Sequence, residues 1–152
     1  MSKDLSKLNL DHLIEKAITP AFLEKLATTA IEQIKRRARL GYSVASEGAN
    51  QSKFDSLAES TKAKRKRLKK RGKLSSETSP SKSNLTESGQ LLDSLEFRIK
   101  GKAVEVFIGG ERNRKVSSYV SKARPWLNLS KAEMTMLLDL IEEAIDKQIK
   151  SN

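Results

Sequence analysis

The feature that most constrains this chain is a block of positive charge near its middle. Between residues 62 and 73, nine of twelve side chains are Lys or Arg, and none is acidic. Like charges at this density repel one another, so the block belongs at the surface and the core must come from the segments on either side. The nine cations are Lys62, Lys64, Arg65, Lys66, Arg67, Lys69, Lys70, Arg71 and Lys73.

The basic block also accounts for most of the net charge. The 152 residues carry a formal charge of +11, of which the block supplies nine, leaving +2 for the rest. A block this local suits nucleic acid or an acidic protein face. The length predicts a single domain over residues 1–152, with an extended basic and Ser-rich arm at about 60–84. A hydrophobic content of 37% and an aromatic content of 5% predict a small core that gains burial against a partner.

The composition also bounds the environment. The chain has no Cys, which excludes disulfides and Cys metal sites and fits a reducing compartment. The N-terminus lacks an apolar signal region, and no apolar run approaches the roughly 20 residues that a membrane span requires. We therefore expect synthesis in a cytoplasm and no membrane partner.

Two helices are predicted before the basic block. Apolar spacing favours a short helix from about residue 9. Thr19 is a cap and Pro20 a first helical residue for a second helix, and Gly41 supplies its left-handed stop. Its last turn carries three arginines that complement the helix dipole and that we expect in solvent: Arg36, Arg37 and Arg39.

The middle of the chain has little periodicity. Residues 47–50 predict a turn, and we expect Phe54 and Leu57 to pin a loop to the core. The basic block favours either an exposed helix or an extended arm that orders fully against something anionic. The Ser-rich segment 75–83 is expected to be a loop.

The second half predicts a hairpin. Apolar and charged residues alternate on both sides of Gly101-Lys102, which favours a β-hairpin over about 95–108 with one buried face. Gly109-Gly110 ends it. We expect a charged loop over residues 111–115 and a short third strand over residues 116–120.

A last helix is predicted over about 131–150. Ser130 and Glu133 fit a capping box, and Leu129 and Met134 fit a hydrophobic staple. The apolar stripe of this helix is Met134, Leu137, Leu138, Ile141, Ile145 and Ile149. The fold class is therefore α+β: two N-terminal helices, a small antiparallel sheet with the C-terminal helix packed on it, and a basic arm at 62–73.

No catalytic constellation is visible in the sequence. His12 is the single His, without a second His or a carboxylate cluster at ligand spacing, so we expect a surface or capping role. The Ser residues lack an evident base and oxyanion site. Gly109-Gly110 is a turn and not a phosphate loop. We predict no enzyme activity, no metal site and no cofactor.

Three runs of sequence resemble one family in order and spacing. Residues 84–95 read NLTESGQLLDSL, residues 124–130 read RPWLNLS, and residues 54–61 read Phe-x-x-Leu-x-x-Ser-Thr before Lys and Arg. The runs resemble the virion morphogenesis proteins of tailed bacteriophages, which include tail-completion and head–tail neck proteins. The motif residues are Asn84, Leu85, Thr86, Ser88, Gly89, Leu91, Leu92, Ser94, Leu95, Arg124, Pro125, Trp126, Leu127 and Leu129.

The resemblance implies a structural role in the virion. It implies a protein of the neck or tail end that completes the tail or joins it to the head, as a homo-oligomeric ring, with six copies expected, around the DNA channel. The implied partners are other copies of itself, the adjoining neck or connector protein, the tail tube or terminator protein, and packaged double-stranded DNA. Family members often carry a longer segment before Arg-Pro. Here Tyr119-Val120 almost directly precedes Arg124, which predicts a short loop.

Individual motif residues have simpler readings as well. Thr86 or Ser88 fits the cap of a short helix carrying Leu91, Leu92 and Leu95, and we expect these leucines in the ordinary core. Trp126 is expected to be buried against the last helix. We expect Arg124 to be bound to an acid or to backbone carbonyl groups where the chain turns into that helix.

Two interpretations of the basic block remain open. It is either a solvated arm that aids solubility, or a surface that faces packaged DNA or an acidic neighbouring protein. Its lack of aromatic residues argues against base stacking and single-strand recognition. The competing function is a small basic DNA-binding protein without sequence specificity. The helix predicted over residues 20–40 lacks the partner spacing of a helix-turn-helix regulator.

Overall fold

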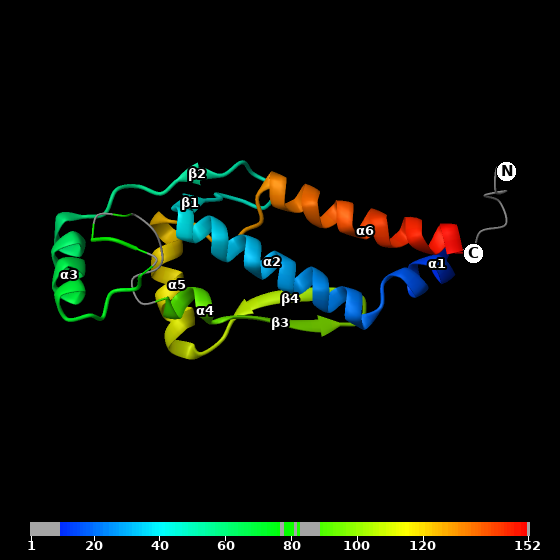
Figure 1. The fold of residues 1–152 in the computed structure, drawn as a ribbon, viewed down its shortest axis with the longest axis horizontal. Helices are drawn as coiled ribbons and strands as arrows, with labels where there is room; N and C mark the ends of the chain where they lie inside the picture. The colour runs from blue at the N-terminus through cyan, green and yellow to red at the C-terminus, as the bar shows by residue number, and fades with distance from the viewer. Residues whose placement is uncertain (1–9, 77, 81, 83–88, 152) are drawn as a thin grey trace.

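A computed structural model describes residues 10–76, 78–80, 82 and 89–151. It confirms the α+β class, with helices first, two small antiparallel sheets and a C-terminal helix. Helix α2 lies along the long axis, with α6 beside it and the larger hairpin against it (Figure 1). The elements are α1 (Leu10–Ala17), α2 (Pro20–Leu40), β1 (Tyr42–Ser43), β2 (Ser52–Lys53), α3 (Glu59–Lys70), α4 (Gln90–Asp93), β3 (Leu95–Lys100), β4 (Ala103–Ile108), α5 (Glu111–Ala123) and α6 (Lys131–Ser151).

Both predicted ends of α2 are confirmed. The Thr19 hydroxyl accepts a hydrogen bond from the Phe22 amide at 3.1 Å, and Pro20 follows as the first helical residue. Gly41 ends the helix at a φ of 89°, a conformation that side-chain-bearing residues rarely adopt. The apolar stripe between these ends is buried: Leu23, Ala27, Ala30, Ile31, Ile34 and Ala38.

The predicted hairpin is also confirmed. Strand β3 pairs with β4 in register from Leu95 opposite Ile108 to Lys100 opposite Ala103, and the turn lies at Gly101. The Leu95 end reaches the core and the Lys100 end is exposed. One cluster of buried side chains joins the hairpin, α2 and the loops: Ile31, Ile34, Ala38, Phe54, Leu92, Leu95, Ile108 and Trp126.

Two expectations for the connecting segments are wrong. Residues 111–123 form helix α5, and not a charged loop followed by a third strand. A charged first turn with an ion pair between Glu111 and Lys115 at 3.4 Å favours a helix here. Because α5 runs to Ala123, helix and not a short loop joins Tyr119-Val120 to Arg124. The two-residue strands β1 and β2 give no periodic signal, so the sequence did not predict them.

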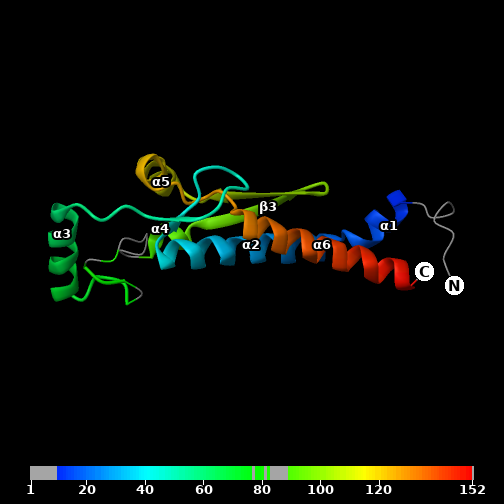
Figure 2. The same ribbon diagram turned by 90° about the horizontal axis from the view of Figure 1, so that it is seen from above.

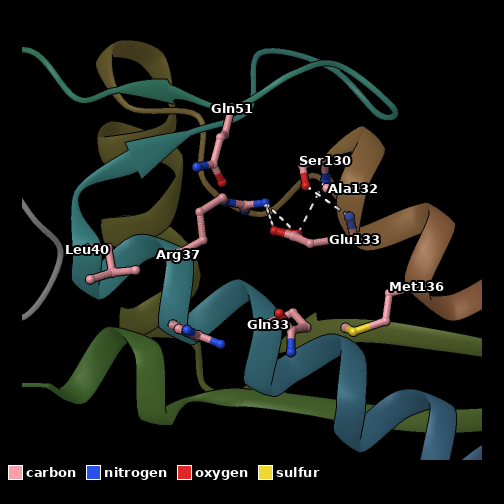
Figure 3. Close-up of a pocket in the computed structure, with 9 residues that line it drawn as sticks. Gln33, Arg37, Leu40, Gln51, Ser130, Ala132, Glu133 and Met136 are labelled. Carbon is pink, nitrogen blue, oxygen red and sulfur yellow. Dashed lines mark hydrogen bonds and ion pairs between the residues drawn. The ribbon is translucent and has the colours of Figure 1, made fainter.

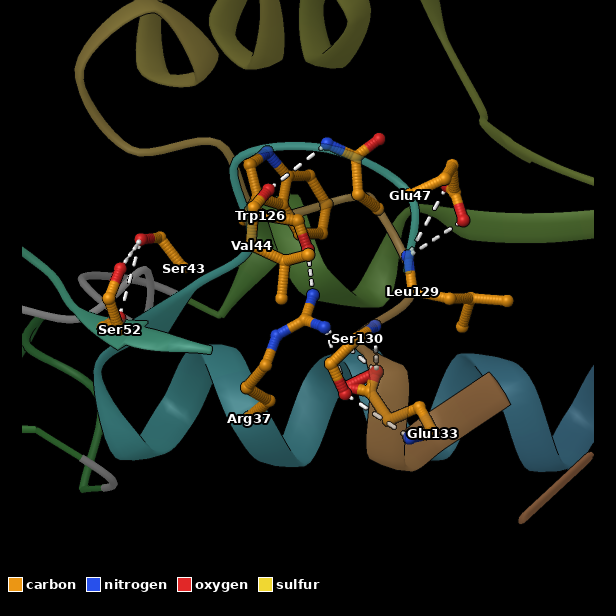
Figure 4. Close-up of polar contacts among 10 residues, drawn as sticks. Arg37, Ser43, Val44, Glu47, Ser52, Trp126, Leu129, Ser130 and Glu133 are labelled. Carbon is orange, nitrogen blue, oxygen red and sulfur yellow. Dashed lines mark hydrogen bonds and ion pairs between the residues drawn. The ribbon is translucent and has the colours of Figure 1, made fainter. Parts of the chain in front are cut away.

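Arg37 is a third correction, because it is buried and not solvated. Its side chain is 3% exposed, and its Nη1 lies 2.6 Å and 2.8 Å from the two carboxylate oxygens of Glu133. Its Nη2 donates to the carbonyl oxygen of Trp126 (Figure 4). Burial lowers the pKa of Arg37, and the adjacent Glu133 carboxylate opposes that effect. The pair joins the end of α2 to the start of α6.

The start of α6 is held from both sides. The Glu133 amide donates to the Ser130 hydroxyl at 3.2 Å, and the Ser130 amide donates to the Glu133 carboxylate at 3.3 Å, which confirms the capping box. The loop between β1 and β2 forms hydrogen bonds with the segment that precedes α6. Val44 donates to the Pro125 carbonyl at 2.9 Å, and Gly48 donates to the Leu129 carbonyl at 2.9 Å.

Helix α6 has its predicted bounds and a different environment. It lies against α1 and α2 instead of packing on the sheet (Figure 1). Among its described side chains the buried one is Glu133, and the predicted apolar stripe is half-buried or exposed. Leu138 is 55% exposed. The helix therefore offers apolar area that this subunit leaves uncovered.

Replacing Arg37 with Ala should lower the free energy of unfolding by about 3–5 kcal/mol, because it leaves the Glu133 carboxylate buried without its partner. Urea denaturation of the full chain measures this change. Arg36→Ala is the matched control, since Arg36 is the exposed neighbour on the same helix turn. It should change stability by about 0.5 kcal/mol or less. Equal effects of the two variants would contradict the structural role of the pair.

Glu105 should titrate at an unusually low pH. Hydrogen bonds from Arg98 at 2.8 Å and Lys100 at 3.2 Å lower its pKa from 4.5 to about 2. Its stabilising contribution is therefore present above pH 4.5 and is lost as the pH falls toward 2. In an NMR titration of the carboxyl carbon, Arg98→Gln should raise this pKa toward 4.5, and Lys102→Gln in the turn should not. A wild-type midpoint near 4.5 would contradict the ion pair.

Candidate nucleic-acid interface

Residues 62–70 of the basic block lie in helix α3. Of the two predicted forms, the block therefore adopts the exposed helix and not the extended arm. The helix lies at the end of the molecule opposite α1 and the C-terminal end of α6 (Figures 1 and 2). Its last turn is closed by hydrogen bonds from Gly72 to the Lys69 carbonyl at 3.1 Å and from Lys73 to the Leu68 carbonyl at 2.9 Å. Cations in this last turn also complement the helix dipole.

Arg65 points away from the other cations of the block. Its side chain is 3% exposed, and its Nη1 donates to the Lys82 carbonyl at 2.7 Å and to the Thr78 hydroxyl at 3.1 Å. These acceptors belong to the Ser-rich segment that follows α3. Arg65 therefore attaches the helix to that segment and does not contribute to the exposed face.

The remaining cations divide into an internal pair and an exposed face. Lys62 is half-buried and lies 3.1 Å from Glu59 one turn earlier. Helical spacing puts most of the other cations on the side opposite Arg65. Seven of them are exposed: Lys64, Lys66, Arg67, Lys69, Lys70, Arg71 and Lys73.

The exposed face keeps its charge largely uncompensated. Within the described residues, all of the seven except Lys64 lack an ion pair. Several lie four residues apart, such as Lys66 with Lys70 and Arg67 with Arg71, and each such like-charge pair opposes helix formation by about 0.2–0.5 kcal/mol. A polyanion laid along this face would relieve that repulsion.

The first family motif has a structural part in the described residues. Asn84, Leu85, Thr86 and Ser88 lie outside those residues, so the predicted cap is not described. Gly89 precedes α4 at a φ of 79°, which favours Gly at this motif position. Leu92 and Leu95 are buried, as predicted, and Leu91 packs half-buried against the core. The short helix ends at Asp93, and Leu95 is the first residue of β3. The prediction that Leu95 lies on this helix was therefore wrong.

The second motif also stabilises the fold. The Arg124 Nη2 donates to the carbonyl oxygen of Asp55 at 3.4 Å, which confirms a bond to backbone. Trp126 is buried, and its carbonyl is one of the groups that Arg37 binds. Leu127 and Leu129 pack half-buried against the core cluster. These motif residues position the chain and are not exposed for binding.

A groove lies between α2 and α6. It has a volume of about 330 Å³, and Arg37 and Glu133 are bound to each other at its base (Figure 3). His12 is exposed on α1. In the described part of the chain, no group of three or more His, Cys, Asp or Glu side chains is placed to hold a metal ion. In that same part no helix has both the length and the apolar character that a membrane span needs.

Comparisons with protein-family models, curated proteins and solved structures find no match for this chain. The resemblance to phage virion proteins therefore stays a prediction from three short runs of sequence.

Arg65→Gln should loosen helix α3 without unfolding the domain, because it removes the charged donor that three acceptors in the following segment share. Amide hydrogen exchange measured by NMR should accelerate several-fold across α3 and stay unchanged in α2. Lys66→Gln, one residue along and exposed, is the control and should leave α3 as protected as in the wild type. Unchanged protection in both variants would contradict the anchoring role.

Proposed function

We propose that this chain is a structural protein of a tailed bacteriophage virion. In this proposal it completes the tail or joins it to the head as one subunit of a ring around the DNA channel. The observation that carries the proposal is the preformed basic helix α3, held by Arg65 at one end of an elongated subunit with its cations outward. Such an arm suits a subunit that meets a negative partner while the rest of the chain contacts its neighbours.

Uncovered apolar surface supports self-assembly. Tyr119 on α5 is 75% exposed, Leu40 at the end of α2 is 58% exposed, and Leu138 on α6 is 55% exposed. Apolar side chains on several faces of a small subunit lose contact with water when copies associate. The two-stranded β3–β4 sheet also has edges that a neighbouring subunit can pair with.

The proposed setting follows from the family resemblance. The ring has six copies and lies in the neck or at the tail end. Its partners are other copies of the chain, an adjoining neck or connector protein, a tail tube or terminator protein, and packaged DNA. A closed ring of identical subunits uses one head-to-tail contact repeated around the axis. No catalytic role is proposed.

The second candidate is a small DNA-binding protein without sequence specificity. It is favoured by the fact that residues of a single chain make up α3 and its exposed cations. The two candidates differ in assembly state. A ring that is present in purified virions supports the first, and a monomer that binds DNA at physiological salt and is absent from virions supports the second.

Leu138→Asp should weaken ring formation, because it places a charge in apolar surface that a neighbour covers. Light scattering coupled to size-exclusion chromatography should detect a shift toward monomer. Thr28→Asp is the matched control, since it adds the same charge at an exposed polar position on a different helix, α2. Circular dichroism of both variants should match the wild type. A wild-type chain that stays monomeric at all concentrations would contradict the ring.

A further inference from the structure

We infer that the exposed face of α3 binds the phosphate backbone of double-stranded DNA without reading its sequence, and that Arg65 positions the helix instead of contacting phosphate. The inference deepens the proposed function by naming the partner of the basic helix. It divides the nine cations into one anchor, one internally paired Lys and a seven-residue binding face.

The charge density of α3 suits a duplex. Its 12 residues make a helix about 18 Å long, at 1.5 Å per residue. A duplex carries one negative charge per about 1.7 Å of axis, so a segment of that length presents about ten phosphates. Five of the seven exposed cations lie within α3, and Arg71 and Lys73 follow it directly. They therefore meet an anion lattice that exceeds them in number.

A second copy of this chain offers a sparser match. The densest exposed acidic face described on this chain, as a neighbouring copy would present it, lies on α6. It has four carboxylates, of which Glu143 already lies 3.6 Å from Lys147. Those residues are Asp139, Glu142, Glu143 and Asp146. Four carboxylates leave part of the basic face unmatched, so the observations favour DNA over a second copy as its partner.

The basic face lacks the side chains that stack on bases or pair with adenine. Residues 59–76 contain no aromatic side chain for stacking on single-stranded bases. They also contain no Asn or Gln, the residues that pair with adenine in the major groove. Lys and Arg contacts to phosphate carry affinity and no sequence information. The expected ligand is therefore duplex DNA of any sequence.

Arg65 has a different part because its side chain is buried against the segment that follows α3. Its Nη1 faces the Thr78 hydroxyl and the carbonyl oxygens of Ser79 and Lys82, all in the segment after α3. A guanidinium held in this way fixes which side of α3 faces outward. Removing it should cost binding through lost order of the helix and not through a lost phosphate contact.

The test is the salt dependence of binding to a mixed-sequence duplex, measured by fluorescence anisotropy on the full chain between about 50 and 200 mM salt. Each phosphate contact contributes about 0.9 to the slope of log K against log salt, so the wild type should give a slope of about −4 to −6. Lys66→Gln with Lys70→Gln should reduce its magnitude by about 2. The matched control, Lys53→Gln with Lys102→Gln, removes two exposed charges away from α3 and should leave the slope unchanged.

Arg65→Gln separates positioning from contact. It should lower affinity several-fold and keep the wild-type slope, because the number of phosphate contacts is the same. A slope that falls by about 0.9 would make Arg65 a phosphate contact and overturn its assigned role. Arg65→Lys, which keeps the charge and loses the planar guanidinium with its fixed donor geometry, should behave like Arg65→Gln and not like the wild type.

Other outcomes distinguish this inference from the proposed function. A wild-type slope near zero would mean that α3 makes no phosphate contacts, and stronger binding to polyglutamate than to duplex would make an acidic protein face the partner. Either result would overturn the inference. Ring formation is measured on the same proteins by light scattering and should survive Lys66→Gln with Lys70→Gln. DNA binding by a chain that never assembles would overturn the ring and leave the DNA surface standing.

Discussion

The bond between Arg37 and Glu133 connects α2, which carries much of the core, to α6, which has little core of its own. It joins the end of α2 to the first turn of α6, and Arg37 also holds the carbonyl of Trp126 between them. Because α6 has little buried apolar surface, a charged pair in a buried site supplies attachment that packing does not. The pair also fixes the chain at Trp126, whose ring completes the core cluster.

The sequence predicted what local chemistry decides. Thr19-Pro20, Gly41, the hairpin turn at Gly101 and the capping box at Ser130 each mark an element through a short-range rule, and each is confirmed. Arg37 was beyond such rules. Helical spacing puts Arg37 on the buried side of α2, but no short-range rule gives its partner, which lies 96 residues away in sequence. The same limit applies to Arg65, whose acceptors are in a segment without periodicity.

The misassigned segments follow from the same distinction. Val116 and Val120 suggested a strand through their β-branched side chains, and the charged turn before them favoured the helix that forms. The predicted stripe of α6 has the right period, and periodicity alone does not say whether the covering surface belongs to the same chain. Leu138 and Tyr119 are exposed, so both leave apolar area that another subunit can cover.

The central claim is that the chain functions as an assembled subunit whose basic helix faces DNA. Electron cryomicroscopy of intact virions at side-chain resolution tests it most directly. The account predicts a ring of copies at the neck or tail end, with α3 of each copy directed at the DNA density in the channel. Virions that lack the chain, or a ring in which α3 points away from the channel, would contradict it.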